Sequence, residues 1–274
     1  MSSSLRDVLA TLRLDRSGDT TFVGEQLPAP ANHILGGHIS AQALLAAGLT
    51  APGRRAHSVH TYFLRPGDAS RPVEFEVVPL QQGRTFSARR VTARQDGEVL
   101  LEAMASFKNA TADDTEYQPP MPDAPAPESL PAAPTHAAED PEKVQGRGQW
   151  ASLRWYQRRV VDAATGPPAP ACFWWRPDGD VPDDPGVHTA LVAYLSAVTL
   201  TEPTFAARGG RLRANAQRDH SVWFHRPAQL SDWMLYDQSS PSAVDGIALA
   251  SGRMYNRTGD LVCTVRQEMY FPPA

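Results

Sequence analysis

Apolar and polar residues alternate along the chain in a way that predicts two similar sets of elements. In the first half, strands are expected over 55–65, 73–80, 84–94 and 99–108, several of them with the period-two pattern of half-buried strands. In the second half, strands are expected over 151–160, 172–176, 219–225, 233–238, 247–256 and 261–271. Each half also contains one apolar helical pattern, over 37–49 and over 187–200. The first of these helices is rich in alanine, so it can lie very close to a sheet.

A short motif is also repeated. Residues 60–66 read His-Thr-Tyr-Phe-Leu-Arg-Pro, and residues 221–227 read Ser-Val-Trp-Phe-His-Arg-Pro. Each copy is followed by two strand patterns, a turn that contains glycine (95–98 and 257–260) and a closing strand. A helix followed by antiparallel strands, present twice, predicts a duplicated α+β fold.

Between the two halves the composition changes sharply. Residues 109–148 are rich in proline, alanine and acidic residues and contain almost no large apolar side chain. Such a segment buries too little apolar surface to fold alone, so we expect an extended tether. The chain is therefore predicted to have three parts: a first unit over 1–110, a proline-rich linker over 111–148 and a second unit over 149–274.

Composition narrows the class of protein. A chain of 274 residues with a formal net charge of -4 is a poor candidate for a general nucleic-acid binder. Cys172 and Cys263 are too few for a disulfide framework and lack metal-ligand spacing, so both are expected to be buried thiols in a reducing compartment. Residues 1–15 form a short amphipathic pattern with charges, unlike a signal peptide or a membrane span. We expect a soluble cytoplasmic protein.

Several common kinds of catalytic site lack their motifs. The sequence has no G-x-S-x-G elbow, no phosphate-binding glycine loop and no H-E-x-x-H pair. Asp219, His220 and Ser221 are consecutive in a predicted strand, so their side chains cannot converge as a triad. These observations argue against a serine hydrolase, a nucleotide-binding enzyme and a zinc hydrolase.

Seven stretches carry a family resemblance. They are 35–38, 42–44, 57–68, 85–91, 105–107, 219–227 and 267–268. Together they strongly resemble the type II acyl-CoA thioesterases, the TesB-like family, over nearly the whole chain except the linker. The resemblance implies a double hotdog, in which each central helix packs on an antiparallel sheet and the two sheets join edge to edge. It also implies hydrolysis of fatty acyl-CoA without a metal or redox cofactor, and further association into a homo-oligomer.

The catalytic residues that the resemblance implies are only partly present. In the family, an Asp near the end of the second helix, a Thr before the Asp-His-Ser strand and a Gln on the last strand hold the attacking water. Those positions are Ala197, Gln217 and Gln267 in this chain. Alanine cannot take a proton, and loss of a general base typically costs about 10²–10⁴-fold in rate. Two hypotheses follow: a thioesterase with an altered catalytic set, or an acyl-CoA binding protein without turnover.

The start of the first central helix offers donors for an oxyanion. The backbone N–H groups of Gly37 and His38, together with the helix dipole, could polarise a thioester carbonyl. Gly36 and Gly37 would let that carbonyl come close, although tight helix packing explains these glycines equally well. The His38 side chain could act as a base or hydrogen-bond the thioester, or be an ordinary histidine. The acyl chain is expected in an apolar channel between the halves, lined by the alanine-rich helix.

Further candidates lie on two predicted strands. Tyr62 and His60 share one face of a strand and could orient water, but Tyr62 also aligns with Trp223, which favours a core aromatic residue. Arg89 and Arg90 point to opposite faces, so one of them is a candidate for binding CoA phosphates. The alternative is a solvated arginine.

The segment 183–188 has two interpretations. Asp183 and His188 have the spacing around a proline that hotdog hydratases use, but the glycine and asparagine of that signature are absent. A helix N-cap at Asp183 or Asp184, with Pro185 in the first turn, explains the segment fully. The sequence leaves open which of the two pseudo-equivalent clefts is active, and a structural role in an assembly remains a third hypothesis.

Overall fold

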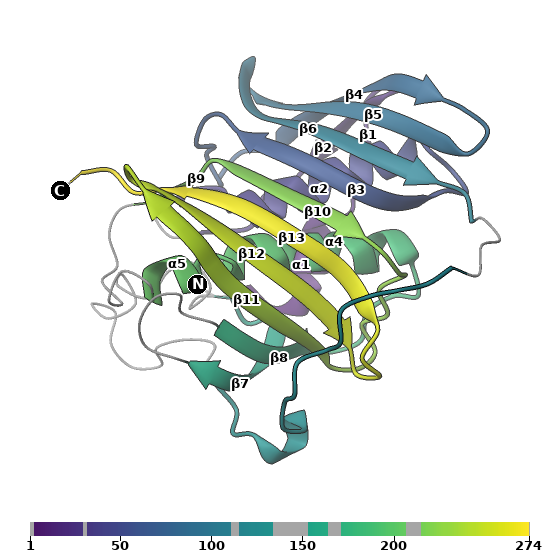
Figure 1. Cartoon of the computed structure of the whole chain (residues 1–274). Helices are drawn as coiled ribbons and strands as arrows, with labels where there is room; N and C mark the ends of the chain where they lie inside the picture. The colour runs from purple at the N-terminus through teal and green to yellow at the C-terminus, as the bar shows by residue number, and fades with distance from the viewer. Residues whose placement is uncertain are drawn as a thin grey trace.

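The two halves of the chain form one continuous antiparallel sheet with the helices against one of its faces (Figure 1). In this computed structural model the described residues are 3–29, 32–110, 115–133, 153–163, 171–206 and 215–273. The sheet has 13 strands in the order β1-β2-β4-β5-β6-β3-β10-β13-β12-β11-β8-β7, and β9 pairs with β13 off this path. The predicted double hotdog is confirmed, because the sheets of the two halves join where β3 pairs with β10.

The first half contains the elements that the apolar pattern predicts and a few more. Its helices are α1 (Leu5–Thr11) and α2 (Gly36–Leu49). Its strands are β1 (Asp15–Arg16), β2 (Thr21–Gly24), β3 (Arg55–Phe63), β4 (Val73–Gln82), β5 (Phe86–Gln95) and β6 (Glu98–Lys108). The expected N-terminal helix is shorter than 1–15, because a short hairpin of β1 and β2 follows it and extends the sheet beyond β4.

The second half repeats this arrangement. Its helices are α4 (Pro185–Thr199) and α5 (Glu202–Ala206). Its strands are β7 (Tyr156–Ala163), β8 (Ala171–Pro177), β9 (Ala216–Gln217), β10 (Asp219–Phe224), β11 (Met234–Val244), β12 (Ile247–Asn256) and β13 (Leu261–Tyr270). Residues 151 and 152 of the first strand expected here lie outside the described residues, and the strand itself begins at Tyr156.

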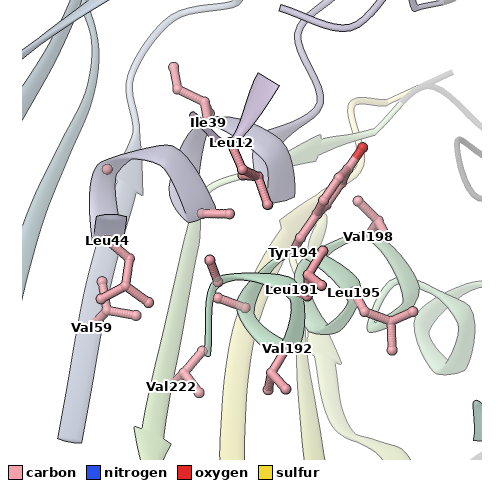
Figure 2. Packing of buried hydrophobic residues seen from close by; sticks show 14 of the residues in the cluster. Leu12, Ile39, Leu44, Val59, Leu191, Val192, Tyr194, Leu195, Val198 and Val222 are labelled. Carbon is pink, nitrogen blue, oxygen red and sulfur yellow. The ribbon is translucent and has the colours of Figure 1, made fainter. Parts of the chain in front are cut away.

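Helices α2 and α4 run antiparallel and touch each other at the seam between the halves. A Cβ atom added to Gly37 would lie 2.5 Å from the backbone oxygen of Tyr194, so only glycine permits this approach. At the other end, Gly186 of α4 faces Leu45 of α2. Figure 2 shows side chains of both helices, among them Leu191, packed with residues of β3 and β10 in one core. The seam is therefore closed along the middle of the helices.

Part of the predicted tether is bound to the second half. Residues 115–133 are extended apart from a short 3-10 turn, η2 (Pro127–Ser129), and they cross the sheet face turned away from the helices (Figure 1). Met121 and Leu130 pack on a cluster that includes Trp174. The Trp174 indole donates a hydrogen bond to the Pro125 carbonyl at 2.9 Å, and the Leu261 N–H donates to Gln118 Oε1. The expected extended conformation holds for this part, but the segment is a docked strap.

Candidate active site

A cavity of about 410 Å³ lies at the seam, where both halves contribute to one pocket. The first half supplies residues between 33 and 39, the end of β3, the following 64–67 and Leu100. The second half supplies Val198 of α4, Phe205 of α5 and residues 215–218. Its volume falls within the range of small-molecule sites. The alanines of α2 are absent from the described lining, so the expected alanine-lined channel is replaced by a pocket at the start of this helix.

The first turn of α2 presents unused donors to this pocket. Leu35 is the N-cap residue and provides no side-chain cap. Its carbonyl accepts the N–H groups of His38 and Ile39, at 3.0 and 3.2 Å. In the described part of the chain, the N–H groups of Gly36 and Gly37 have no hydrogen-bond acceptor. Such groups carry the positive end of the helix dipole, so this turn is suited to a partially negative oxygen.

The equivalent turn of α4 is different. Asp184 is its N-cap residue, and the carboxylate accepts the N–H groups of Gly186 at 2.8 Å and Val187 at 3.4 Å. The predicted N-cap is therefore confirmed, with Pro185 in the first turn. His188 Nδ1 accepts the Leu230 N–H at 3.2 Å. The capping bonds account for Asp184, while Asp183 and His188, the pair with the hydratase spacing, both line a separate cavity of about 580 Å³.

Gln217 joins the two helices at the bottom of the pocket. Its Nε2 donates a hydrogen bond to the backbone oxygen of Ala197 at 2.7 Å. A Cβ atom on Gly36 would collide with Gln217 Oε1, so the amide group occupies the space that this glycine leaves. The side chain thus reaches from the last turns of α4 to the first turn of α2.

Gln267 lies behind Gln217 on the inner face of the sheet. It is fully buried on β13, and its Nε2 contacts Met269 Sδ at 3.3 Å. Met269 pairs with Gln217 in the register of β13 and β9. Gln267 Oε1 is buried and has no hydrogen-bond partner among the described residues. The structure therefore brings Gln217 to Ala197, whereas Gln267 lies two residues from the strand partner of Gln217 and is not part of the described pocket lining.

Residues Gly37 and His38 both serve the packing of α2. Gly37 permits the contact with α4 described above, while its N–H stays available. The His38 ring is buried, lies 5.5 Å from the Tyr194 ring and places Nε2 3.0 Å from Thr11 Oγ1 of α1. Burial lowers the pKa of His38 to about 3. Its ring is therefore neutral and is directed toward α1 and not into the pocket.

Tyr62 and His60 lie on the outer face of the sheet. Val59 and Thr61 of the same strand are buried on the inner face, so their neighbours must point the other way. Tyr62 is 58% exposed, and neither Tyr62 nor His60 lines the pocket. His60 Nδ1 lies 3.1 Å from Ser221 Oγ. The structure does not bring these two residues to Gln217 and Gln267.

Arg89 lies at the far end of α2 from the pocket. It is 2% exposed, and its guanidinium donates hydrogen bonds to Thr50 Oγ1 and the Thr50 carbonyl, at 2.9 and 2.8 Å. It also donates to the Gln81 carbonyl and to Gln82 Oε1. The Thr50 bonds satisfy groups that follow the C-terminus of α2, and the other two tie this end of the helix to β4. Arg89 is thus engaged inside the fold and is not part of the pocket lining.

Sequence reasoning missed the cationic and aromatic parts of the pocket wall. His33, Arg65 and Arg218 line it, and Arg65 pairs with Glu98 at 3.1 Å. Arg65 belongs to the repeated motif, but nothing in the repeat indicates that its copy near α2 borders a cavity. Phe205 belongs to α5, a five-residue helix that no periodicity could reveal.

The described residues contain neither a metal site nor a membrane-spanning helix. Within the described ranges, no group of three or more His, Cys, Asp or Glu residues is arranged to hold a metal ion. Among the helices that the structure describes, none is long and apolar enough to cross a membrane.

Comparisons with known proteins agree with this geometry. A family model described as acyl-CoA thioesterase matches residues 165–270, and one described as acyl-CoA thioesterase N-terminal domain matches residues 25–108. Acyl-CoA thioesterase 2 of Haemophilus influenzae is 32% identical over 98% of both chains, and acyl-coenzyme A thioesterase 8 of Homo sapiens is 32% identical over 96% of this chain and 89% of its own. The solved structure of a tesB protein from Mycobacterium avium subsp. paratuberculosis is 65% identical over 98% of this chain and 100% of its own, with a TM-score of 0.88.

Proposed function

The chain belongs to the acyl-CoA thioesterase family, and from this premise we propose that it hydrolyses fatty acyl-CoA to free acid and CoA in the pocket at the start of α2. This location is supported by the N–H groups of Gly36 and Gly37, which have no acceptor among the residues that the structure describes. A thioester oxygen placed there gains negative charge as water attacks its carbon, and preorganised N–H donors stabilise that charge. The carbon–sulfur bond then breaks and the sulfur leaves as the CoA thiol.

The two pseudo-equivalent helix starts are not equally available. At α4, the Asp184 carboxylate already accepts the N–H groups of Gly186 and Val187. A substrate carbonyl there would compete with a full negative charge for the same donors. At α2 the cap position is Leu35, which cannot compete. This difference supports the α2 end as the active cleft.

The pocket wall suits the two parts of an acyl-CoA molecule. Ile39, Phe63 and Val198 are apolar residues near the helix start, where the acyl chain would begin. Arg218 lines the same pocket and could bind CoA phosphates at its mouth, whereas burial lowers the pKa of His33 and favours its neutral ring. In this arrangement Gln217 and Gln267 hold the water, and Gln217 Oε1 moves aside when the thioester oxygen approaches Gly36.

A substitution at Gly36 tests this location. Gly36→Ala would push the Gln217 amide away from Ala197 and crowd the place of the thioester oxygen. We expect kcat/KM for acyl-CoA to fall by about 10²-fold, as for other small misplacements of reacting groups. Gly48→Ala is the matched control in the same helix, because its nearest atom would be Phe107 Cε1 at 3.8 Å. Equal rates for the two variants would contradict the assignment.

A second candidate function is supported by one observation. Ala197 provides no carboxylate, and the described lining of the pocket contains no Asp or Glu. These features fit an acyl-CoA binding protein without turnover. Thiol release and binding should be measured with the same panel of acyl-CoA compounds. Binding without thiol release would favour this second function and contradict hydrolysis.

We also propose that the protein forms a homo-oligomer. Tyr62, Met104 and Trp223 are 58%, 45% and 38% exposed on neighbouring strands of the outer sheet face. Apolar side chains grouped on a free sheet face favour association. Light scattering of the purified protein should give a mass of at least twice the 29.8 kDa of one chain. A monomer at micromolar concentration would contradict this proposal.

A further inference from the structure

Beneath the pocket, His220 is held in one defined tautomer. Its Nε2 lies 3.0 Å from Ser196 Oγ, and Ser196 Oγ lies 3.0 Å from the Ala193 carbonyl. A carbonyl can only accept, so the serine proton is donated to Ala193. His220 Nε2 must therefore carry the proton that it donates to Ser196. The other ring nitrogen, Nδ1, is left with a lone pair, and it is buried without a partner among the described residues.

Gln267, on the neighbouring strand, presents a second buried acceptor. Ser221 of β10 pairs with Arg266 of the antiparallel strand β13. The neighbouring residues His220 and Gln267 therefore lie opposite each other on the two strands. Both side chains are fully buried on the inner face, where side chains at such positions have Cβ atoms about 5 Å apart. Gln267 Oε1 also lacks a partner. One water molecule could donate a proton to each of these acceptors, and buried acceptors are normally satisfied in this way.

The two acceptors lie next to the position where the family carboxylate is missing. Ser196, which holds His220, directly precedes Ala197 in α4. Gln217 connects Ala197 to the start of α2, and its strand partner Met269 contacts Gln267. His220 therefore lies in the core next to the Ala197 position, while neither His220 nor Gln267 belongs to the described lining of the pocket itself.

We propose that His220 Nδ1 accepts the proton of the hydrolytic water that Gln267 holds, in place of the carboxylate that Ala197 lacks. This inference rests on the proposed function of the same pocket. The water O–H bond breaks, the proton moves to Nδ1, and the oxygen forms a bond with the thioester carbon. When the carbon–sulfur bond breaks, the sulfur takes that proton and leaves as the CoA thiol, so His220 returns to its neutral form.

The surroundings keep His220 in its accepting form. The side chains facing it are Ser196 of α4, Gln267 of β13 and Thr61 of β3, none of which carries a charge. Burial lowers the pKa of His220 to about 3, so its ring is neutral at ordinary pH. The negative charge that develops on the thioester oxygen would stabilise the imidazolium during the reaction.

Two amide substitutions each keep one hydrogen-bonding function of the ring but remove its ability to take a proton. His220→Gln keeps a donor near Nε2 for Ser196, whereas His220→Asn keeps an acceptor near Nδ1. Neither amide takes a proton, so we expect kcat for acyl-CoA to fall by about 10²–10⁴-fold in both variants, with KM within about twofold. Thr61→Val is the control, because Thr61 is buried beside His220 on β3 and bonds only to Ser40 among the described residues. Its kcat should stay near that of the wild type.

The outcomes distinguish this inference from the proposed function. Near-wild-type kcat in either His220 variant would overturn the inference, while a wild-type protein without thiol release would overturn the function itself. Adding Ala197→Asp to His220→Gln should restore part of the lost rate, because the carboxylate can then take the proton.

If the His220 variants do not fold, the pH dependence of kcat/KM for the wild-type protein still tests the inference. With an acyl-pantetheine substrate, kcat/KM should stay constant from pH 7 to 5. A decline centred near pH 6.5, the ordinary pKa of histidine, would contradict a base as deeply buried as His220.

Discussion

Two buried histidines make the stability of the protein depend on pH. The pKa values of His38 and His220 are each lowered to about 3 by burial, whereas a histidine in the unfolded chain titrates near 6.5. Between these values the unfolded state binds protons that the folded state does not. Stability from these residues is therefore fully present above about pH 6.5 and is lost as the pH falls toward 3.

We predict that His38→Gln reduces this pH dependence. Each buried histidine should contribute a slope of about 1.4 kcal/mol per pH unit to the free energy of unfolding between pH 6 and 4. Urea unfolding at several pH values should therefore show a shallower dependence for His38→Gln than for the wild type. Thr11→Val is the control: it removes the partner of His38 Nε2 but keeps the ring, so it should lower stability by the same amount at every pH. Parallel curves for wild type and His38→Gln would contradict the prediction.

Single residues also show the limit of sequence reasoning at the site. The motif that contains Tyr62 and His60 was recognisable, but alternation alone does not tell which face of the strand meets the helices. Both faces carry apolar or aromatic residues, with Val59 and Phe63 on one and Tyr62 on the other. Packing against α2 decides the question, and it places Tyr62 outside. The positions of Gln217 and Gln267, by contrast, followed from aligned motifs; Gln217 lines the pocket and contacts Ala197, while the catalytic role of both residues stays a prediction.

At the scale of elements, the contact between α2 and α4 depends on Gly37. We predict that Gly37→Ala lowers the free energy of unfolding by about 1–3 kcal/mol, since a Cβ atom 2.5 Å from the Tyr194 backbone oxygen forces the helices apart. Gly48→Ala in the same helix should be neutral or stabilise by up to about 1 kcal/mol. Chemical denaturation of both variants measures the difference. An unchanged free energy of unfolding in Gly37→Ala would contradict the prediction, because the helices would then separate without loss of stability.

A separate prediction concerns Arg89, which binds groups at the C-terminal end of α2. Arg89→Met should destabilise the protein by about 3 kcal/mol, because the Thr50 carbonyl and other buried acceptors lose a charged donor. Arg90→Met is the matched control on the same strand, since Arg90 is exposed on the outer face. Below the unfolding temperature, KM for acyl-CoA should be unchanged in both. A raised KM in Arg89→Met alone would instead indicate a role in CoA binding.

Long periodic elements were predictable and short ones were not. The patterns over 37–49 and 187–200 are long enough to define α2 and α4 within about two residues. The hairpin of β1 and β2, together with α5 and β9, consists of pieces of two to five residues, in which no period can develop. Their conformations depend on the sheet and helices that they contact. Since α5 and β9 form one wall of the pocket, the sequence could not define the cavity.

At the scale of the whole molecule, the duplication explains the sheet but not the active cleft. The repeat predicts two equivalent clefts, and only the difference between Leu35 and Asp184 at the helix starts separates them. We predict that Asp184→Ala destabilises the protein by about 1 kcal/mol, the usual contribution of an N-cap, while kcat stays unchanged. Thermal unfolding and thiol release measure the two effects. Together with Gly36→Ala, for which we expect the opposite pattern, this variant tests which cleft is active.

The two halves are expected to depend on each other for folding. β3 pairs with β10 from Tyr62–Asp219 to Ser58–Trp223, and α2 touches α4 along the same seam. The strap over 115–133 lies in the linker that follows the first unit, and it packs on the second unit. Either half alone would expose a sheet edge and fully buried residues such as Val59 and Val222.

A protease site inserted between residues 134 and 150 tests this dependence. After cleavage, we predict that the two fragments elute together in size-exclusion chromatography and keep the thiol-release rate of the uncut protein, because the sheet, helix and strap contacts all remain. Each fragment expressed alone should lack a cooperative unfolding transition, since its share of the core is incomplete. When the separately expressed fragments are mixed, activity should return only if the two are refolded together. Fragments that separate under native conditions, or a lone half that unfolds cooperatively, would show that the duplicated units are independent domains.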